Sequence, residues 1–200
     1  MKLYHGTSAE SAINIIKSGG FNVDKQVWHC SGDYIYFWSP DRLHELSNTV
    51  YGNAEEHVKE SIMCAFDSAT TAAAVQSSNS ENVFVIEYTY TGSAECVEVD
   101  SSCEAMLNSG AVCLSPDDLQ GRITAVYVAD YSSKVSLFYL CSVLDNDFIN
   151  YDFSIAERII CEQLNQLDSD SLFDVLDVQD WHALSEADIL DLQNGYRTFF

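Results

Sequence analysis

The stretch KLYHGTSAESAINIIKSGGF, residues 2–21, decides how the start of the chain folds. Its first residues favour a short strand, and Gly6 then permits a tight turn or the close approach of a ligand. Thr7 or Ser8 can cap the helix that follows, in which alanine and isoleucine recur at helical spacing. The pair Gly19-Gly20 ends that helix, as glycines commonly do. The stretch therefore predicts a strand, a turn and an amphipathic helix.

His5 stands at the end of this predicted strand, directly before Gly6 and the start of the helix. Backbone N–H groups at a helix N-terminus attract anions and polar ligand groups, so His5 occupies a candidate binding position. On spacing alone, an ordinary strand-end histidine with satisfied hydrogen bonds is the alternative interpretation.

The chain of 200 residues suits one domain, or one domain with an appendage. It contains no run of 18 apolar residues and no apolar segment behind its N-terminus, so we expect neither a membrane span nor a signal peptide. Seven cysteines are scattered without any CxxC pair, which favours free thiols in a reducing cytoplasm. His29 lies beside Cys30, but no second pair completes a metal site. We therefore expect a cytoplasmic protein without a metal.

The charge balance is strongly acidic, with 9 basic and 31 acidic residues and a formal net charge of −22. Proteins that bind nucleic acid directly need stripes of lysine and arginine to contact phosphates. The composition therefore disfavours nucleic acid as a partner and leaves open a protein with a basic surface.

The remaining pattern alternates between strands and helices. Helices are predicted at residues 41–47, 54–66, 70–76 and 101–108. Strands are predicted at residues 82–90, 95–100, 111–114, 123–129 and 137–144, with the first two paired as a hairpin. From residue 154 the apolar spacing becomes helical, and acidic residues dominate. We expect a domain at 1–145 and an acidic helical extension at 146–200.

An aromatic strand is predicted within GDYIYFWSP, residues 32–40, which ends in proline. Alternation places Tyr34, Tyr36 and Trp38 on one face and the two apolar residues between them on the other. The three rings would form a flat wall, although a buried strand with aromatic residues on both sides is the plainer interpretation.

Two of these motifs together resemble a known family. Tyr4-His5-Gly6-Thr7 and the Gly32-x-x-Ile35-Tyr36-Phe37 run resemble the first and second motifs of the ADP-ribosyltransferase fold, in its His-Tyr-Glu branch. This branch includes diphtheria toxin and the poly(ADP-ribose) polymerases. The resemblance covers about residues 1–130 and implies an α+β fold, with a split antiparallel sheet and flanking helices.

The resemblance also implies a binding site for NAD as a substrate, without a metal. His5 would hold the nicotinamide ribose, and the backbone of Gly6 would pair with the carboxamide. Thr7 would lie near the adenosine ribose. Tyr36 would stack on the nicotinamide ring, beside Tyr34, and such stacking contributes about 0.5–2 kcal/mol.

The family's third motif places a carboxylate at the front of a late strand, which here fits residues 111–114. Gly110 or Ala111 stands where that glutamate would be. Glu104 is the nearest acidic residue upstream and is our candidate for the third catalytic residue. Asp117 and Asp118 are the nearest downstream.

Three functions follow as hypotheses. The first is a mono-ADP-ribosyltransferase that modifies a macromolecular acceptor, most simply a protein with a basic surface. Its small size resembles that of the toxin-like effectors and inhibitors of host defence that phages and bacteria carry. The second is an acidic binding protein on a degenerate transferase scaffold, which would mimic nucleic acid. The third is an NAD glycohydrolase, in which water replaces the acceptor.

Overall fold

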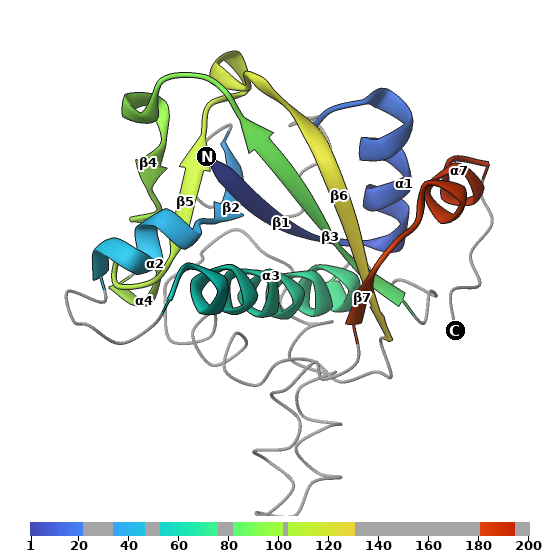
Figure 1. Cartoon of the computed structure of the whole chain (residues 1–200), viewed down its shortest axis with the longest axis horizontal. Helices are drawn as coiled ribbons and strands as arrows, with labels where there is room; N and C mark the ends of the chain where they lie inside the picture. Colours follow the sequence, from blue (N-terminus) through green and yellow to red (C-terminus); the bar gives the residue numbers. More distant parts are fainter. Residues whose placement is uncertain (22–33, 47–52, 76–81, 102–103, 131–180, 195–200) are drawn as a thin grey trace, which may run out of the picture.

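Within the residues that the structure describes, an antiparallel sheet of seven strands forms the centre of the molecule, in the order β4-β5-β2-β1-β3-β6-β7 (Figure 1). The structure is a computed structural model, and it describes residues 1–21, 34–46, 53–75, 82–101, 104–130 and 181–194. The strands are β1 (Lys2–Ser8), β2 (Ile35–Trp38), β3 (Asn82–Tyr90), β4 (Glu98–Val99), β5 (Ala111–Leu114), β6 (Gly121–Asp130) and β7 (Trp181–Ala183). The α+β class predicted from the sequence is thus confirmed.

Helices pack on both faces of this sheet. They are α1 (Ala9–Ser18), α2 (Pro40–Leu46), α3 (Ala54–Val75), α4 (Glu104–Leu107) and α7 (Glu186–Gln193), with 3₁₀ turns η2 (Ala94–Cys96) and η3 (Pro116–Asp118). The long helix α3 crosses one face of the sheet (Figure 1), and its alanines pack against Tyr4, Trp38 and Val85. We call this face the α3 face. The isoleucines of α1 pack on the opposite face, against Phe84 and Ile86, and we call it the α1 face.

The predicted strand and helix at the start of the chain are confirmed. Ser8 is the N-cap of α1, where its side chain accepts a hydrogen bond from the backbone N–H of Ser11 at 3.4 Å. Gly19 is the C-cap, with φ 72° in the left-handed region that suits glycine. The predicted turn at Gly6 is wrong, because β1 continues through Gly6 to Ser8.

The two helices predicted at 54–66 and 70–76 form one continuous helix, α3. The polar residues at this junction do not break it, and their hydroxyls bond to carbonyls of the helix itself. Ser68 Oγ donates to the Cys64 carbonyl at 3.2 Å, and Thr70 Oγ1 donates to the Asp67 carbonyl at 2.8 Å.

The predicted hairpin between residues 82–90 and 95–100 is also wrong. The first strand has the predicted bounds, but the second segment forms the turn η2 and the short strand β4. β4 pairs with β5 at the far edge of the sheet. Both edges of β3 are already occupied, by β1 and by β6, so no edge remains there for a hairpin partner.

The extension predicted to be helical contains a strand where it is described. β7 pairs with β6, with His182 opposite Val128, and α7 follows it. Trp181 packs against Phe66 and Tyr127, at ring-centroid distances of 6.1 and 5.5 Å. The described end of the chain is therefore part of the same sheet and core.

Other predictions fall outside the described residues. These are the loop with Trp28, His29 and Cys30, the strand at 137–144 and the helices at 154–180. The division into 1–145 and 146–200 stays a prediction. Among the helices that the structure describes, none is long and apolar enough to cross a membrane.

Candidate functional site

His5 lies in an aromatic cluster on the α1 face. Its ring contacts Phe21 and Phe37 edge-on, with centroids 5.0 and 5.8 Å away. Phe21 also contacts Phe37 and Tyr88 edge-on, at 5.2 and 5.5 Å. Aromatic rings prefer such edge-to-face contacts. The cluster therefore fixes the plane of the imidazole.

One hydrogen bond fixes the tautomer of His5. Its Nδ1 lies 2.8 Å from the main-chain carbonyl oxygen of Tyr36, which can only accept a hydrogen bond. Nδ1 therefore carries the proton and donates it, and Nε2 presents a lone pair. Burial lowers the pKa of His5, while the bond to the Tyr36 carbonyl acts in the opposite direction. The ring is thus neutral at pH 7 and can accept a hydrogen bond at Nε2.

The side chain of Tyr36 lies on the other face of the sheet from that of His5. Ile35 and Phe37, its neighbours in β2, belong to the cluster on the α1 face. Alternation along the strand places Tyr36 on the α3 face with Trp38, whose Nε1 donates to Ser68 of α3 at 2.9 Å. The structure therefore joins His5 to the main chain of Tyr36 and not to its ring.

The two strands that carry these residues part soon after they meet. β1 and β2 share one described register pair, Tyr4 with Trp38, whereas β2 and β5 share four. The His5–Tyr36 hydrogen bond spans 31 residues of sequence and connects the strands beyond that pair. Beyond the Tyr4–Trp38 pair, the His5 side chain therefore connects the two strands in place of backbone hydrogen bonds.

The other predicted NAD-contacting residues have mixed surroundings. Gly6 lies against the backbone of α3, where a Cβ atom would collide with the Ala65 carbonyl. The space that a side chain at position 6 would fill is thus occupied by the backbone of α3. Thr7 is buried opposite Phe84, and Tyr34 is half-buried just before β2.

The third-motif strand is the neighbour of β2, with Ala111 opposite Trp38. The side chain of Ala111 is buried, and a Cβ atom on Gly110 would meet the side chain of Leu43. Glu104 begins α4, seven residues before β5, and the position of its side chain lies outside the description. No described carboxylate therefore occupies the start of β5 itself.

A buried carboxylate that the sequence interpretation missed lies on β3. Glu87 is 5% exposed and accepts hydrogen bonds from the Tyr4 hydroxyl at 3.2 Å and the Tyr127 hydroxyl at 3.0 Å. Thr124 Oγ1 donates to it at 2.8 Å, and Lys2 Nζ lies 3.0 Å from Oε1. We call these five residues the Glu87 cluster. It joins β1, β3 and β6.

The electrostatics of the Glu87 cluster favour the ionised carboxylate. Burial raises the pKa of Glu87, but the hydrogen bonds from Thr124, Lys2 and Tyr127 outweigh it and hold that pKa below its usual range. Burial and the nearby carboxylate raise the pKa of both Tyr4 and Tyr127. Each hydroxyl therefore stays protonated and keeps donating. The available signal was that Glu87 is the one charged residue in the run NVFVIEYTY.

The described thiols do not form a nucleophilic or metal-binding centre. Burial raises the pKa of Cys64 and of Cys113 to about 12, so both are protonated at neutral pH. Among the described residues, no group of three or more His, Cys, Asp or Glu side chains could hold a metal ion. Comparison with protein-family models, curated protein sequences and solved structures finds no match for this chain.

Proposed function

We propose that this protein is a mono-ADP-ribosyltransferase, which transfers ADP-ribose from NAD to a macromolecular acceptor. The observation that carries the proposal is the order β5-β2-β1. The two segments that resemble the family's motifs, and the segment where its third motif would fall, are distant in sequence but form three neighbouring strands. The His5–Tyr36 hydrogen bond ties two of them together at the motif residues.

NAD would bind where β1 and β2 part. Neutral His5 would accept a hydrogen bond from a hydroxyl of the nicotinamide ribose at Nε2, and Tyr36 would stack on the cationic nicotinamide ring. Because the two side chains lie on opposite faces, the dinucleotide would lie across the junction of the strands and not flat on one face. Pinning both ends of the scissile bond in this way favours a reaction that develops an oxocarbenium-like ribose.

The net charge of the protein indicates which kind of acceptor it would modify. With a net charge of −22, the protein would be attracted to a basic protein surface and repelled by nucleic acid phosphates. A small acidic transferase of this kind would act as an effector on a host complex, in the manner of the phage and bacterial proteins that it resembles.

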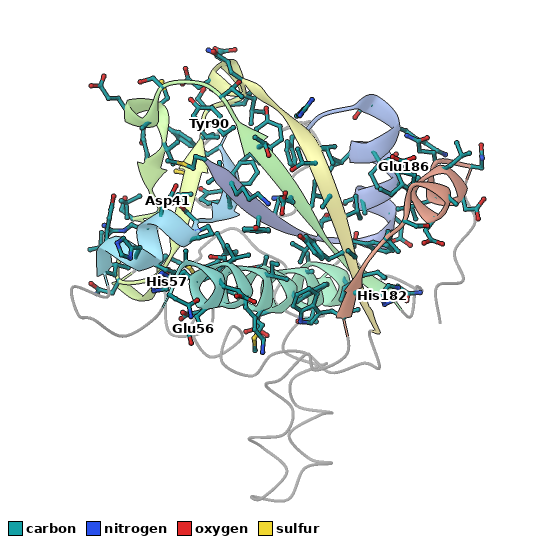
Figure 2. All side chains as sticks on the ribbon, in the orientation of Figure 1. Asp41, Glu56, His57, Tyr90, His182 and Glu186 are labelled. Carbon is teal, nitrogen blue, oxygen red and sulfur yellow. The ribbon has the colours of Figure 1, made fainter. Side chains whose placement is uncertain are left out.

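Labelled NAD and a bacterial lysate test the proposal. The protein should label one dominant acceptor band and release nicotinamide, and His5→Gln and Tyr36→Ala should each lower both signals by about 10²-fold or more. The matched control is His182→Ala, because His182 is an exposed histidine on β7, at the opposite edge of the sheet from β4 (Figure 2). Thermal unfolding of each variant separates loss of the site from loss of the fold. Labelling that survives both site changes would overturn the assignment.

A second candidate is an acidic binding protein on the same scaffold. The buried Ala111 side chain at the start of β5, where the family places a carboxylate, favours it. Binding through carboxylates should weaken steeply with salt and should be indifferent to His5→Gln. Nicotinamide release without any labelled acceptor would instead indicate an NAD glycohydrolase.

A further inference from the structure

Tyr88 lies in the aromatic cluster that surrounds His5, on the same face of the sheet. Its ring stacks on Phe37 with centroids 5.9 Å apart and contacts Phe21 edge-on at 5.5 Å. Both of those rings also contact the imidazole of His5. Register pairs His5 with Ile86, two residues before Tyr88, so Tyr88 is the diagonal neighbour of His5 on the adjoining strand. Diagonal neighbours on one face are about 7–8 Å apart, within reach of aromatic side chains.

The hydroxyl of Tyr88 differs from those of the other buried tyrosines that the structure describes. Tyr4, Tyr88 and Tyr90 are 0%, 4% and 3% exposed. The Tyr4 hydroxyl donates to Glu87 at 3.2 Å, and the Tyr90 hydroxyl donates to the Ser93 carbonyl at 3.0 Å. Within the described part of the chain, the Tyr88 hydroxyl forms no hydrogen bond. A buried tyrosine hydroxyl normally has a partner, so this one is available to a ligand.

The Tyr88 hydroxyl can donate a hydrogen bond at neutral pH. Burial raises the pKa of Tyr88, so the phenol keeps its proton. The ring atom Cζ, which carries the hydroxyl, lies against Gly121, where an added Cβ atom would come within 2.9 Å of it. The hydroxyl is therefore on the β6 side of the aromatic cluster, and His5 is on its β1 side. A ligand that contacts both residues extends across the cluster.

We propose that the Tyr88 hydroxyl donates a hydrogen bond to the diphosphate of NAD, an inference that rests on the proposed transferase function. The diphosphate is joined directly to the nicotinamide ribose, so a dinucleotide that continues from His5 along the α1 face presents phosphate oxygens next. A hydrogen bond from a hydroxyl to an ionised phosphate is about twice as strong as one between neutral groups. Tyr88 is thus a binding residue that sets the direction in which NAD extends from His5. It takes no part in bond cleavage.

Tyr88→Phe tests this contact, because it removes the hydroxyl and keeps the ring. The Kd for ADP-ribose and the KM for NAD should rise about tenfold or more, as expected for a lost hydrogen bond to a charged group. The kcat for nicotinamide release should change only a few-fold, because the contact is the same in the ground state and the transition state. Nicotinamide riboside, which lacks the diphosphate, should bind the variant and the unmodified protein equally.

Tyr90→Phe is the matched control, because Tyr90 lies on the same strand and the same face, and its hydroxyl already bonds to the Ser93 carbonyl. This control should leave the Kd for ADP-ribose unchanged and lower the midpoint of thermal unfolding by a few degrees. Tyr88→Phe should unfold at the temperature of the unmodified protein, since it removes no hydrogen bond between described residues.

Each result bears on one level of the proposal. If the unmodified protein binds neither NAD nor ADP-ribose, the proposed function fails and the role of Tyr88 fails with it. If it binds both, and Tyr88→Phe binds them as tightly, only the role of Tyr88 is overturned. An equal loss of affinity for nicotinamide riboside would move the contact to the ribose and overturn its assignment to the diphosphate. A Tyr88→Phe protein that unfolds several degrees earlier would show that the hydroxyl has a structural partner, which would overturn the proposal as well.

Discussion

Tyr4 and His5 are consecutive residues of β1, and they face two different environments. Tyr4 points to the α3 face, where its hydroxyl donates to the ionised carboxylate of Glu87. His5 points to the α1 face, where Phe21 and Phe37 surround its ring. One side of the strand is held by charge and hydrogen bonds, and the other by aromatic packing. The motif that suggested a function therefore also contains a residue that is needed chiefly for the fold.

The two environments differ in the charge state that they favour, because one keeps His5 neutral and the other keeps Glu87 ionised. Apolar rings make a charged imidazole costly, so His5 is kept neutral with its proton on Nδ1. Donors from the two neighbouring strands, β1 and β6, make a charged carboxylate favourable, so Glu87 stays ionised although it is buried. The first arrangement suits a ligand contact. The ionised Glu87 suits a structural role, because its hydrogen bonds link β1, β3 and β6.

The largest expected effect on stability comes from removing the carboxylate of the Glu87 cluster. Glu87→Ala should destabilise the fold by about 3 kcal/mol, because it leaves the Tyr4 and Tyr127 hydroxyls and the Lys2 ammonium without their shared acceptor. Chemical denaturation measures the change in the free energy of unfolding. The control is Glu95→Ala, which removes an exposed carboxylate and should change stability by less than about 0.5 kcal/mol. Equal effects of the two substitutions would contradict a structural role for Glu87.

A smaller effect is expected at Gly6, which lies against the backbone of α3. Gly6→Ala should destabilise the protein by about 2 kcal/mol, because the new Cβ atom would collide with the Ala65 carbonyl and force α3 away from β1. Gly20→Ala is the matched control, because a Cβ atom there meets nothing within 4 Å. Thermal unfolding and NAD binding are measured on both. A stable Gly6→Ala protein that fails to bind NAD would show that the ligand, and not α3, requires this glycine.

Local signals predicted much of the fold. The strand and helix of residues 2–21 follow from apolar spacing, the Ser8 cap and the terminal glycine, which are all contained within one segment. The strand at 82–90 has the bounds that alternation predicted. The sequence prediction divided α3 into helices at 54–66 and 70–76, whereas the helix continues through this junction, where the hydroxyls of Ser68 and Thr70 bond within it.

The candidate site depended on register, which sequence patterns do not contain. The alternation within each strand was readable, but the pairing of Tyr4 with Trp38 decides whether His5 and Tyr36 face the same side. A shift of one residue would exchange the faces. The same pairing information places Cys113 beside Tyr36, and Glu87 beside Tyr4 and Tyr127. None of these neighbours is close in the chain.

The pH dependence of stability distinguishes the two environments most finely. Both His5 and Glu87 have a folded pKa below the ordinary value, so each stabilises the fold above that value and loses its contribution as pH falls. For His5 the loss starts below about pH 6.5, and for Glu87 below about pH 4.5. Each slope is limited to about 1.4 kcal/mol per pH unit for a single proton. The free energy of unfolding should therefore fall in two separate steps on acidification.

Two variants assign these steps. His5→Gln should remove the loss that starts near pH 6.5 and leave the lower one, whereas Glu87→Gln should do the reverse. Denaturant titrations from pH 7.5 to pH 3.5 measure both slopes on the same protein. If His5→Gln left the upper step unchanged, the imidazole would already be solvated in the folded state, and the aromatic cluster would not be what keeps Nε2 available as an acceptor. The lowered pKa of His5, which keeps the ring neutral, thus links the packing of Phe21 and Phe37 directly to the proposed hydrogen bond with a ribose hydroxyl.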